Sequence, residues 1–158
     1  MTRTKRSVTQ TMNNKQNYGC SGDCLTADMR ITMSDGSTKP ISAVRLGESI
    51  LDGQRDVALV GYVTWGSESA VVCLTLENGG ILKATPNHPI LTPNGFKRMG
   101  DLRPGDQLQG LNGTQTVKST IVTAYNDRVF NLALERSSTM LCEGIIVGDA
   151  GTQSALSH

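Results

Sequence analysis

The sequence predicts an all-β fold of short strands, and three observations support this prediction. Apolar residues occur in short groups, and no long stretch keeps the spacing of an amphipathic helix. Turn sequences rich in Gly, Asn, Asp and Pro separate the groups. The chain also contains an internal duplication, which favours one closed domain of two related halves with pseudo-twofold symmetry.

The expected strands follow one another from Cys24 onwards. They are centred on Ile31–Met33, Val57–Val60, Val71–Leu76, Ile121–Val122 and Val129–Leu134. The turn signals between and around them lie at residues 34–36, 52–53, 77–80, 93–95, 104–106 and 111–113. Three isolated aromatic residues in strand-like surroundings are expected to fill the core or an interface: Tyr62, Trp65 and Tyr125.

The duplication becomes visible when the sequence is shifted by 58 residues against itself. Residues 39–51 then align with residues 97–109, and residues 71–77 align with residues 129–135 without a gap. Both copies of the first segment contain an Arg-x-Gly-acid step, which is ordinary punctuation at the entry to a strand. Two copies favour a closed β domain over a solenoid, which needs about three or more stacked repeats.

Composition limits the function classes. With 158 residues and 37% apolar content, the chain can build one sizeable core. Its 15 basic and 14 acidic residues give a net charge of +1, so no nucleic acid or anionic membrane is expected as a partner. No apolar run approaches the roughly 18 residues of a membrane helix, and the start lacks the apolar run of a signal peptide. We therefore expect a soluble protein, with its compartment left open.

The expected domain organisation has three parts. Residues 1–23 are polar and basic with almost no apolar pattern, as in a flexible flanking segment. Residues 24–149 hold all the strand-like groups and form the domain, and residues 150–158 form a tail.

Four cysteines lack the paired spacing of a zinc ribbon. Cys20 and Cys24 are separated by three residues, so they could form a disulfide, bind a metal or act as alternative nucleophiles. Cys73 and Cys142 lie on apolar strands and are expected in the core, although Cys142 could lie close enough to a site to modulate it.

The most informative pattern is Cys24 followed about sixty residues later by Thr85-Pro86-Asn87-His88. Taken singly, a cysteine in a small β domain is usually a buried apolar residue, and a histidine is usually a hydrogen-bonded structural one. Together they supply a potential nucleophile and a potential acid, which suggests chemistry on the chain's own backbone.

These motifs resemble those of Hint domains, the fold shared by inteins, bacterial intein-like domains and Hedgehog autoprocessing domains. The resemblance covers roughly residues 24–149 and has three parts: an opening Cys24-Leu25-Thr26-Ala27-Asp28, a Thr-x-x-His region at Thr85–His88, and closing strands from Val129-Phe130-Asn131-Leu132 to Val147. It implies a compact all-β horseshoe in which Cys24 and His88 meet at the centre.

The resemblance also implies a mechanism. The Cys24 thiolate would attack the carbonyl of Asp23 and convert the Asp23-Cys24 amide into a thioester, and His88 would protonate the departing Cys24 nitrogen. Thr85 would hydrogen-bond the scissile peptide. Further candidate modulators of this site are Asp23, Cys20, Asn131, Cys142 and Asp149.

The carboxyl end departs from the splicing pattern. Splicing inteins end in a His-Asn pair followed by Cys, Ser or Thr, whereas this chain has Gly148-Asp149-Ala150 at the matching positions. Gly148 cannot act as an acid, the Asp149 carboxylate is a poorer internal nucleophile than an amide, and Ala150 offers no acceptor. Full splicing is therefore not expected.

The expected function is a single-turnover autoproteolytic cleavage. An N-to-S acyl shift at Asp23-Cys24 is followed by thioester cleavage by water, a thiol or an amine, with the chain's own upstream segment as substrate and no cofactor or metal. Attack by the Asp23 carboxylate through a five-membered anhydride would favour hydrolysis.

Two alternatives remain open. One is a degenerate Hint fold that acts as a structural or interaction module. The other, weaker alternative is zinc binding by Cys20, Cys24 and His88, which offers only three ligands and no second pair to complete the coordination shell.

Overall fold

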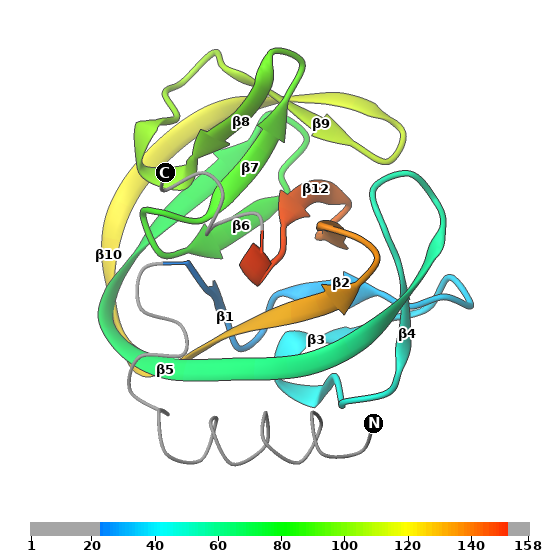
Figure 1. The fold of residues 1–158 in the computed structure, drawn as a ribbon. Coiled ribbons are helices and arrows are strands. Elements are labelled where there is room, and N and C mark those ends of the chain that lie inside the picture. Colours follow the sequence, from blue (N-terminus) through cyan, green and yellow to red (C-terminus); the bar gives the residue numbers. More distant parts are fainter. Residues whose placement is uncertain (1–22, 152–158) are drawn as a thin grey trace.

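The computed structural model of the protein describes residues 23–151, in which strands dominate (Figure 1). These residues form twelve strands and two 3-10 helices: β1 Leu25–Thr26, β2 Arg30–Thr32, β3 Thr38–Pro40, η1 Ile41–Ala43, β4 Ser49–Leu51, β5 Val57–Leu76, β6 Ile81–Ala84, β7 Pro89–Thr92, β8 Gly95–Arg98, η2 Met99–Asp101, β9 Gln107–Gly110, β10 Gly113–Glu135, β11 Thr139–Cys142 and β12 Ile145–Gly148. The all-β prediction is confirmed.

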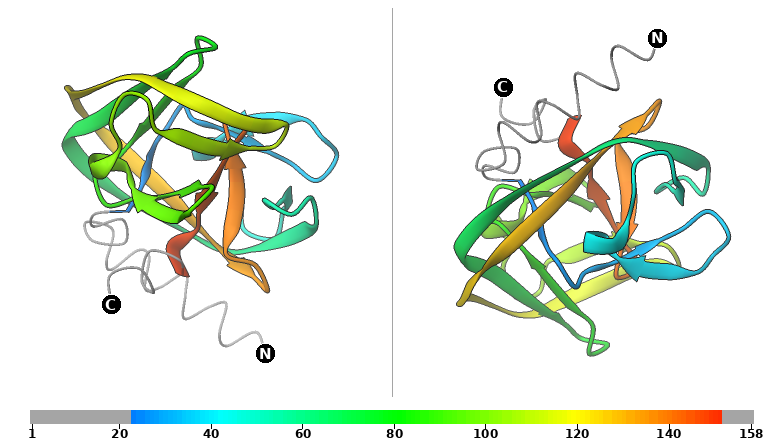
Figure 2. Two further views of the ribbon diagram at one scale, coloured as in Figure 1. Left: turned by 90° about the horizontal axis from the view of Figure 1, so that it is seen from above. Right: turned by 90° about the horizontal axis from the view of Figure 1, so that it is seen from below.

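Two long antiparallel strands, β5 and β10, frame the domain. They pair with each other from Leu76↔Val117 to Leu59↔Glu135, and they curve around the outside of the fold (Figures 1 and 2). The short strands β1 and β6 are hydrogen-bonded within the same sheet, and β12 lies in the interior between β11, β9 and β7. The curved pair thereby surrounds the two ends of the domain, β1 and β12.

The length of this pair is where the structure differs from the expected strand pattern. The apolar groups Val57–Val60 and Val71–Leu76 are the two ends of one strand, β5, and Ile121–Val122 and Val129–Leu134 both lie in β10. The residues between the groups contain no Pro, and a β-bulge between Ala124 and Asp127 lets β10 bend without ending. The apolar groups therefore do not mark separate strands, and Ile121 and Val122 are exposed on the surface of β10.

The duplication in the sequence is present in the structure at the same shift. Helix η1 has its counterpart in η2, and β4 has its counterpart in β9. The ion pair between Lys39 and Glu48 (2.7 Å) recurs as the ion pair between Lys97 and Asp106 (3.3 Å). These pairs are partly solvent-exposed and contribute little stability each, so they report the symmetry of the two halves rather than hold the halves together.

The Arg-x-Gly-acid steps also form matching turns. Glu48 accepts a hydrogen bond from the Arg45 N–H, and Asp106 accepts one from the Arg103 N–H. The glycine of each step has a positive φ, 88° in the first copy and 94° in the second, which an L-residue with a side chain rarely adopts. This conformation explains why the glycine occurs in both copies.

The core is one large apolar cluster beneath the sheets and a small second one. The large cluster draws on both halves and includes Leu25, Ile90, Leu132 and Cys142, all fully buried. The small cluster consists of Cys24, Val71 and Val129, with Tyr125 packed against it. Among the described residues, no helix has the length and apolar character needed to cross a membrane.

Candidate active site

The peptide between Asp23 and Cys24 lies in the centre of the fold. Cys24 directly precedes β1, and Leu25 pairs with Phe130 of β10 on one side and with Ala84 of β6 on the other. Because β1 fills the position between two longer strands, the residues before it are enclosed as well. Cys24 is completely buried, and only 7% of Asp23 is exposed.

Thr85 holds the Cys24 backbone. It follows β6 directly, and its Oγ1 accepts a hydrogen bond of 2.8 Å from the Cys24 N–H. The Thr85 N–H donates to the Cys24 carbonyl oxygen, also at 2.8 Å. The nitrogen that would leave in an acyl shift is therefore hydrogen-bonded to a buried hydroxyl.

A tight turn brings His88 to the same place. The His88 N–H donates to the Thr85 carbonyl oxygen (3.2 Å), with Pro86 and Asn87 at the centre of the turn. Proline favours this central position because its φ is already that of the turn. The spacing of the Thr-x-x-His pattern thus follows from a four-residue turn that places both side chains in the interior.

The His88 ring is fully buried and lies between the two ends of the domain. Its Nε2 contacts the Gly148 carbonyl oxygen at 2.9 Å. A carbonyl oxygen can only accept, so Nε2 carries the proton of the neutral ring and Nδ1 has a lone pair. Nδ1 lies beside the Asp23 carbonyl group without a hydrogen bond of ordinary geometry. Nδ1 is thus a buried polar atom without a hydrogen-bond partner beside the Asp23-Cys24 peptide.

Burial determines the protonation of His88. It lowers the pKa of the imidazole to about 4, and the nearby carbonyl groups of Gly148 and Asp23 only partly oppose this effect. The ring is therefore neutral near pH 7 and can accept a proton at Nδ1.

Asn131 provides a hydrogen-bond donor to the carbonyl of Asp23. Its Nδ2 donates to the Asp23 carbonyl oxygen at 2.6 Å, and its Oδ1 accepts from the Leu132 N–H at 2.8 Å. The second bond fixes which end of the side-chain amide faces Asp23. Asn131 is fully buried on β10, so water does not compete for either bond.

The Asp23 side chain is also unusual. Burial raises the pKa of its carboxyl to about 7, a hydrogen bond with Asn131 lowers it, and the charge of Asp149 raises it further. Asp23 therefore titrates close to neutral pH, and its charge state depends on a residue at the other end of the domain.

Asp149 itself is tied to backbone groups. Its N–H donates to the Ser138 carbonyl oxygen, and its Oδ2 accepts from the Leu134 N–H, both at 2.9 Å. These bonds attach the end of β12 to β10 and to the connection between β10 and β11. Asp149 is 2% exposed, like the residues of the first end.

The cysteines fall into different environments. Cys24 is disulfide-bonded, while Cys73 and Cys142 are free. Cys142 lies in the large core cluster rather than in the small cluster that contains Cys24, so the structure does not bring these two together. Cys20 lies outside the described residues. Within residues 23–151, no three His, Cys, Asp or Glu side chains gather closely enough to hold a metal ion.

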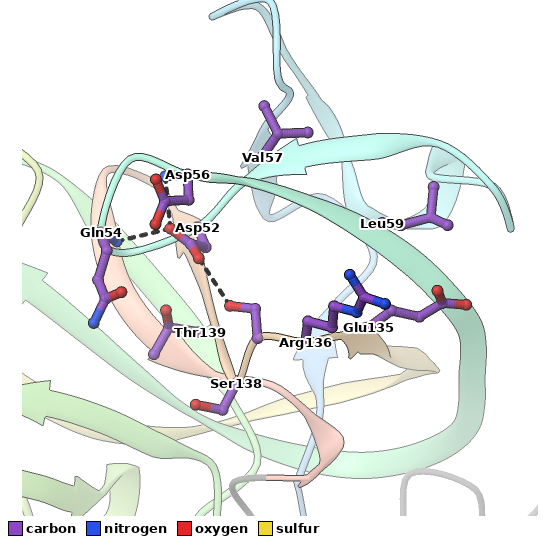
Figure 3. A pocket seen from close by; sticks show the side chains of 10 residues that line it. Asp52, Gln54, Asp56, Val57, Leu59, Glu135, Arg136, Ser138 and Thr139 are labelled. Atoms are coloured by element: carbon purple, nitrogen blue, oxygen red, sulfur yellow. Dashed lines mark hydrogen bonds between the residues drawn. The ribbon is translucent and has the colours of Figure 1, made fainter.

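A surface cavity of about 610 Å³ lies away from Cys24, between the connection from β4 to β5 and the connection from β10 to β11 (Figure 3). Its buried carboxylate, Asp52, accepts hydrogen bonds from the N–H groups of Gln54 and Asp56 and from the Ser137 hydroxyl. The bond from Ser137 joins the two connections, while the other two lie within the connection from β4 to β5. No predicted site residue lines the cavity.

Two contributors to the site have no signal in the sequence. One is the Gly148 carbonyl, which fixes the tautomer of His88, because any residue could supply a carbonyl at that position. The other is Tyr125, which packs against the cluster around Cys24 and whose sequence surroundings resemble those of any strand aromatic.

Comparison with known proteins gives consistent results. The sequence matches no protein-family profile. It is 29% identical over 114 residues to protein RecA of Mycobacterium shimoidei, covering 60% of this chain and 26% of RecA. It is 34% identical over 97 residues to the replicative DNA helicase DnaB of Rhodothermus marinus, covering 54% of this chain and 10% of the helicase. The chain thus spans about a quarter or less of these relatives, and what they share with it is one segment.

Solved structures match over nearly their whole length. A bacterial intein-like domain from Clostridium thermocellum has a TM-score of 0.73 at 19% identity, with 82% of this chain and 99% of that domain covered. The gp41-1 intein gives 0.70 at 17% identity, with 82% and 100% covered. A DnaB intein from Synechocystis sp. PCC 6803 gives 0.66 at 22% identity, with 80% and 98% covered. The fold expected from the sequence motifs is confirmed.

Proposed function

The chain is a domain of the Hint fold, and from this premise we propose that it cleaves its own backbone at Asp23-Cys24 through an N-to-S acyl shift. One observation carries the proposal: Thr85, Asn131 and the lone pair of His88 converge on the single peptide group that precedes Cys24. Thr85 and His88 come from one turn, and Asn131 comes from β10.

The reaction begins with the Cys24 thiol. Its sulfur attacks the Asp23 carbonyl carbon and closes a five-membered ring through Cβ, Cα and N of its own residue. Because attacker and target are neighbours in the chain, the step is intramolecular and avoids the entropy cost of bringing two molecules together. The C–S bond forms, the C–N bond breaks, and the product is a thioester of Asp23 on Cys24.

His88 moves the proton. Its Nδ1 takes the proton of the Cys24 thiol, and the resulting imidazolium gives it to the departing Cys24 nitrogen. The contact of Nε2 with Gly148 keeps the ring in the tautomer that this transfer needs. Thr85 holds the departing N–H in place and so prevents the peptide from rotating away.

Asn131 stabilises the negative charge that develops on the Asp23 oxygen. Its Nδ2 is already 2.6 Å from that oxygen, within a buried and poorly solvated region. A donor placed in advance in such surroundings stabilises an oxyanion strongly, because little reorganisation accompanies the reaction.

The thioester is resolved by water, a thiol or an amine, and the products are residues 1–23 and 24–158. Gly148 and Asp149 provide no His-Asn pair, so splicing does not follow. When Asp23 is ionised, its carboxylate attacks the thioester carbonyl, releases the Cys24 thiolate and forms a five-membered anhydride that water opens.

Reduction is a precondition for the reaction. A disulfide-bonded Cys24 has no thiol and cannot attack. The test therefore starts with a phosphine reductant, which frees Cys24 without being a thiol nucleophile. Intact mass spectrometry then follows the chain with and without dithiothreitol. We expect scission after Asp23 that needs reduction and is accelerated by the thiol.

Two variants complete this experiment. Cys24→Ala is expected to abolish cleavage, whereas Cys73→Ala, a change at a free cysteine on β5, leaves it intact. Survival of cleavage in Cys24→Ala would move the nucleophile elsewhere. An uncleaved wild-type chain after reduction would support the alternative function, a Hint fold that acts as a structural or interaction module.

A further inference from the structure

Tyr125 occupies a special position on β10. It directly precedes Asn126, which has a positive φ of 56°, and it lies where the pairing of β10 with β5 is irregular, between Ala124 and Asp127. A bulge of this kind turns a side chain away from the regular alternation of a strand. Here the Tyr125 side chain reaches the start of the domain, 98 positions away in the sequence.

The Tyr125 hydroxyl joins two backbone segments. It accepts a hydrogen bond from the Ala27 N–H at 3.0 Å and donates one to the Arg128 carbonyl oxygen at 2.7 Å. Ala27 directly follows β1, which is only two residues long. The hydroxyl therefore holds the ring over the start of the domain in one orientation.

The ring packs against the cluster that contains the nucleophile. Cys24, Val71 and Val129 form a buried cluster, and Tyr125, which is half-buried, packs against it. Tyr125 is the member of this cluster that reaches solvent. A reagent that approaches the sulfur of Cys24 from this side meets an aromatic ring and apolar side chains.

We propose that Tyr125 selects the nucleophile that resolves the thioester on Cys24, admitting small molecules and excluding bulky, charged thiols. This inference rests on the proposed function. In the step concerned, the nucleophile forms a bond to the Asp23 carbonyl carbon, the C–S bond breaks, and the proton of the nucleophile passes to the Cys24 thiolate. The ring adds a steric barrier and a desolvation cost that grow with the size and charge of the reagent.

The test compares two reagents on each variant after reduction with a phosphine. Hydroxylamine is the small nucleophile and glutathione the bulky, charged one, each used where the cleavage rate is proportional to its concentration. The ratio of the two rates is compared between variants, so the intrinsic reactivities of the reagents cancel. A change that affects both reactions equally leaves the ratio unchanged, and a matched alanine variant elsewhere on the sheet controls for a general loosening of the fold.

Tyr125→Ala is expected to raise the glutathione rate relative to the hydroxylamine rate by about tenfold, which corresponds to about 1.4 kcal/mol in one barrier. Tyr125→Phe keeps the ring and keeps the wild-type ratio, while its loss of the hydroxyl slows both rates. Tyr125→Leu keeps an apolar contact at this position and so remains folded if the alanine variant does not; it gives an intermediate ratio. Tyr62→Ala, a matched change on β5, leaves the ratio unchanged.

If the ratio of the glutathione rate to the hydroxylamine rate stays at the wild-type value in both Tyr125→Ala and Tyr125→Leu, selection by Tyr125 is overturned. It is also overturned if Tyr62→Ala changes this ratio as much as Tyr125→Ala does. Failure of the proposed function has a different signature: the reduced wild-type chain would then be cleaved by neither reagent.

Discussion

The two ends of the domain meet at His88 but are built differently. At Asp23-Cys24, side chains from the Thr85–His88 turn and from β10 contact the peptide group itself. At Gly148-Asp149, the peptide groups bond mainly to other backbone groups, and the Asp149 carboxylate accepts a backbone N–H. The first arrangement can change the reactivity of a bond, whereas the second closes a sheet. Under the proposed function, one fold thus keeps a reactive junction at one end and a structural one at the other.

Loss of His88 tests the group that the two ends share. His88→Ala removes the proton carrier, so the cleavage rate after reduction should fall by about 10²–10⁴-fold, the usual range for a general acid-base residue. The rate is measured by intact mass over time. Unchanged circular dichroism and an unchanged cleavage rate together would show that the orphaned Nδ1 has no role in the reaction.

Asn131→Ala tests the first junction alone. Without the donor to the Asp23 oxygen, the rate should fall by roughly 10²–10³-fold, as for loss of one oxyanion donor. Asn94→Ala, a change in the exposed turn between β7 and β8, serves as the control and should cleave normally. If both variants cleave at the wild-type rate, the short bond to Asp23 is purely structural.

The Gly148-Asp149 junction can be given the side-chain amide that it lacks. Asp149→Asn introduces an amide that can cyclise onto its own carbonyl, so slow scission after residue 149 should appear in addition to the scission after residue 23. Asp149→Ala should show no second scission, since alanine cannot cyclise. Mass spectrometry distinguishes the two products. Absence of the second product in Asp149→Asn would mean that the backbone bonds around residue 149 hold it away from the geometry that cyclisation needs.

The smallest expected effect concerns the protonation of Asp23, which depends on Asp149 at the other end of the domain. Asp23 has a raised pKa of about 7, so its carboxylate, the form that attacks the thioester, appears as pH rises through that value. The ratio of the hydrolysis rate of wild type to that of Asp23→Ala should therefore rise by a few-fold through about pH 7. Burial is the main cause of the raised pKa, and the groups acting on Asp23 are Asn131 and Asp149.

Asp149→Ala should then move this rise to lower pH, because it removes a like charge. A flat ratio between pH 5 and 9 would exclude attack by the Asp23 carboxylate.

The sequence predicted most of the scaffold because the scaffold is repeated. Lys39 and Glu48 recur as Lys97 and Asp106, and the glycine turns between them recur as well, so a simple shift of the sequence detected both halves. The continuity of β5 and β10 could not be predicted in this way, since polar and small residues interrupt the apolar groups in the middle of each strand.

The site was predictable where its residues belong to a local pattern. Thr85 and His88 are joined by one turn, and their spacing reflects it. The roles of Asn131 and Tyr125 depend on contacts with residues 108 and 98 positions away, which no local pattern encodes. The tautomer of His88 depends on a backbone carbonyl, and every residue carries one.

The central claim is a thioester between Asp23 and Cys24, and trapping it with hydroxylamine tests the claim most directly. After reduction with a phosphine, the released segment should end at Asp23 and carry a carboxyl-terminal hydroxamate, and none should form from Cys24→Ala. A segment that ends elsewhere, or a hydroxamate that also forms without Cys24, would contradict the account.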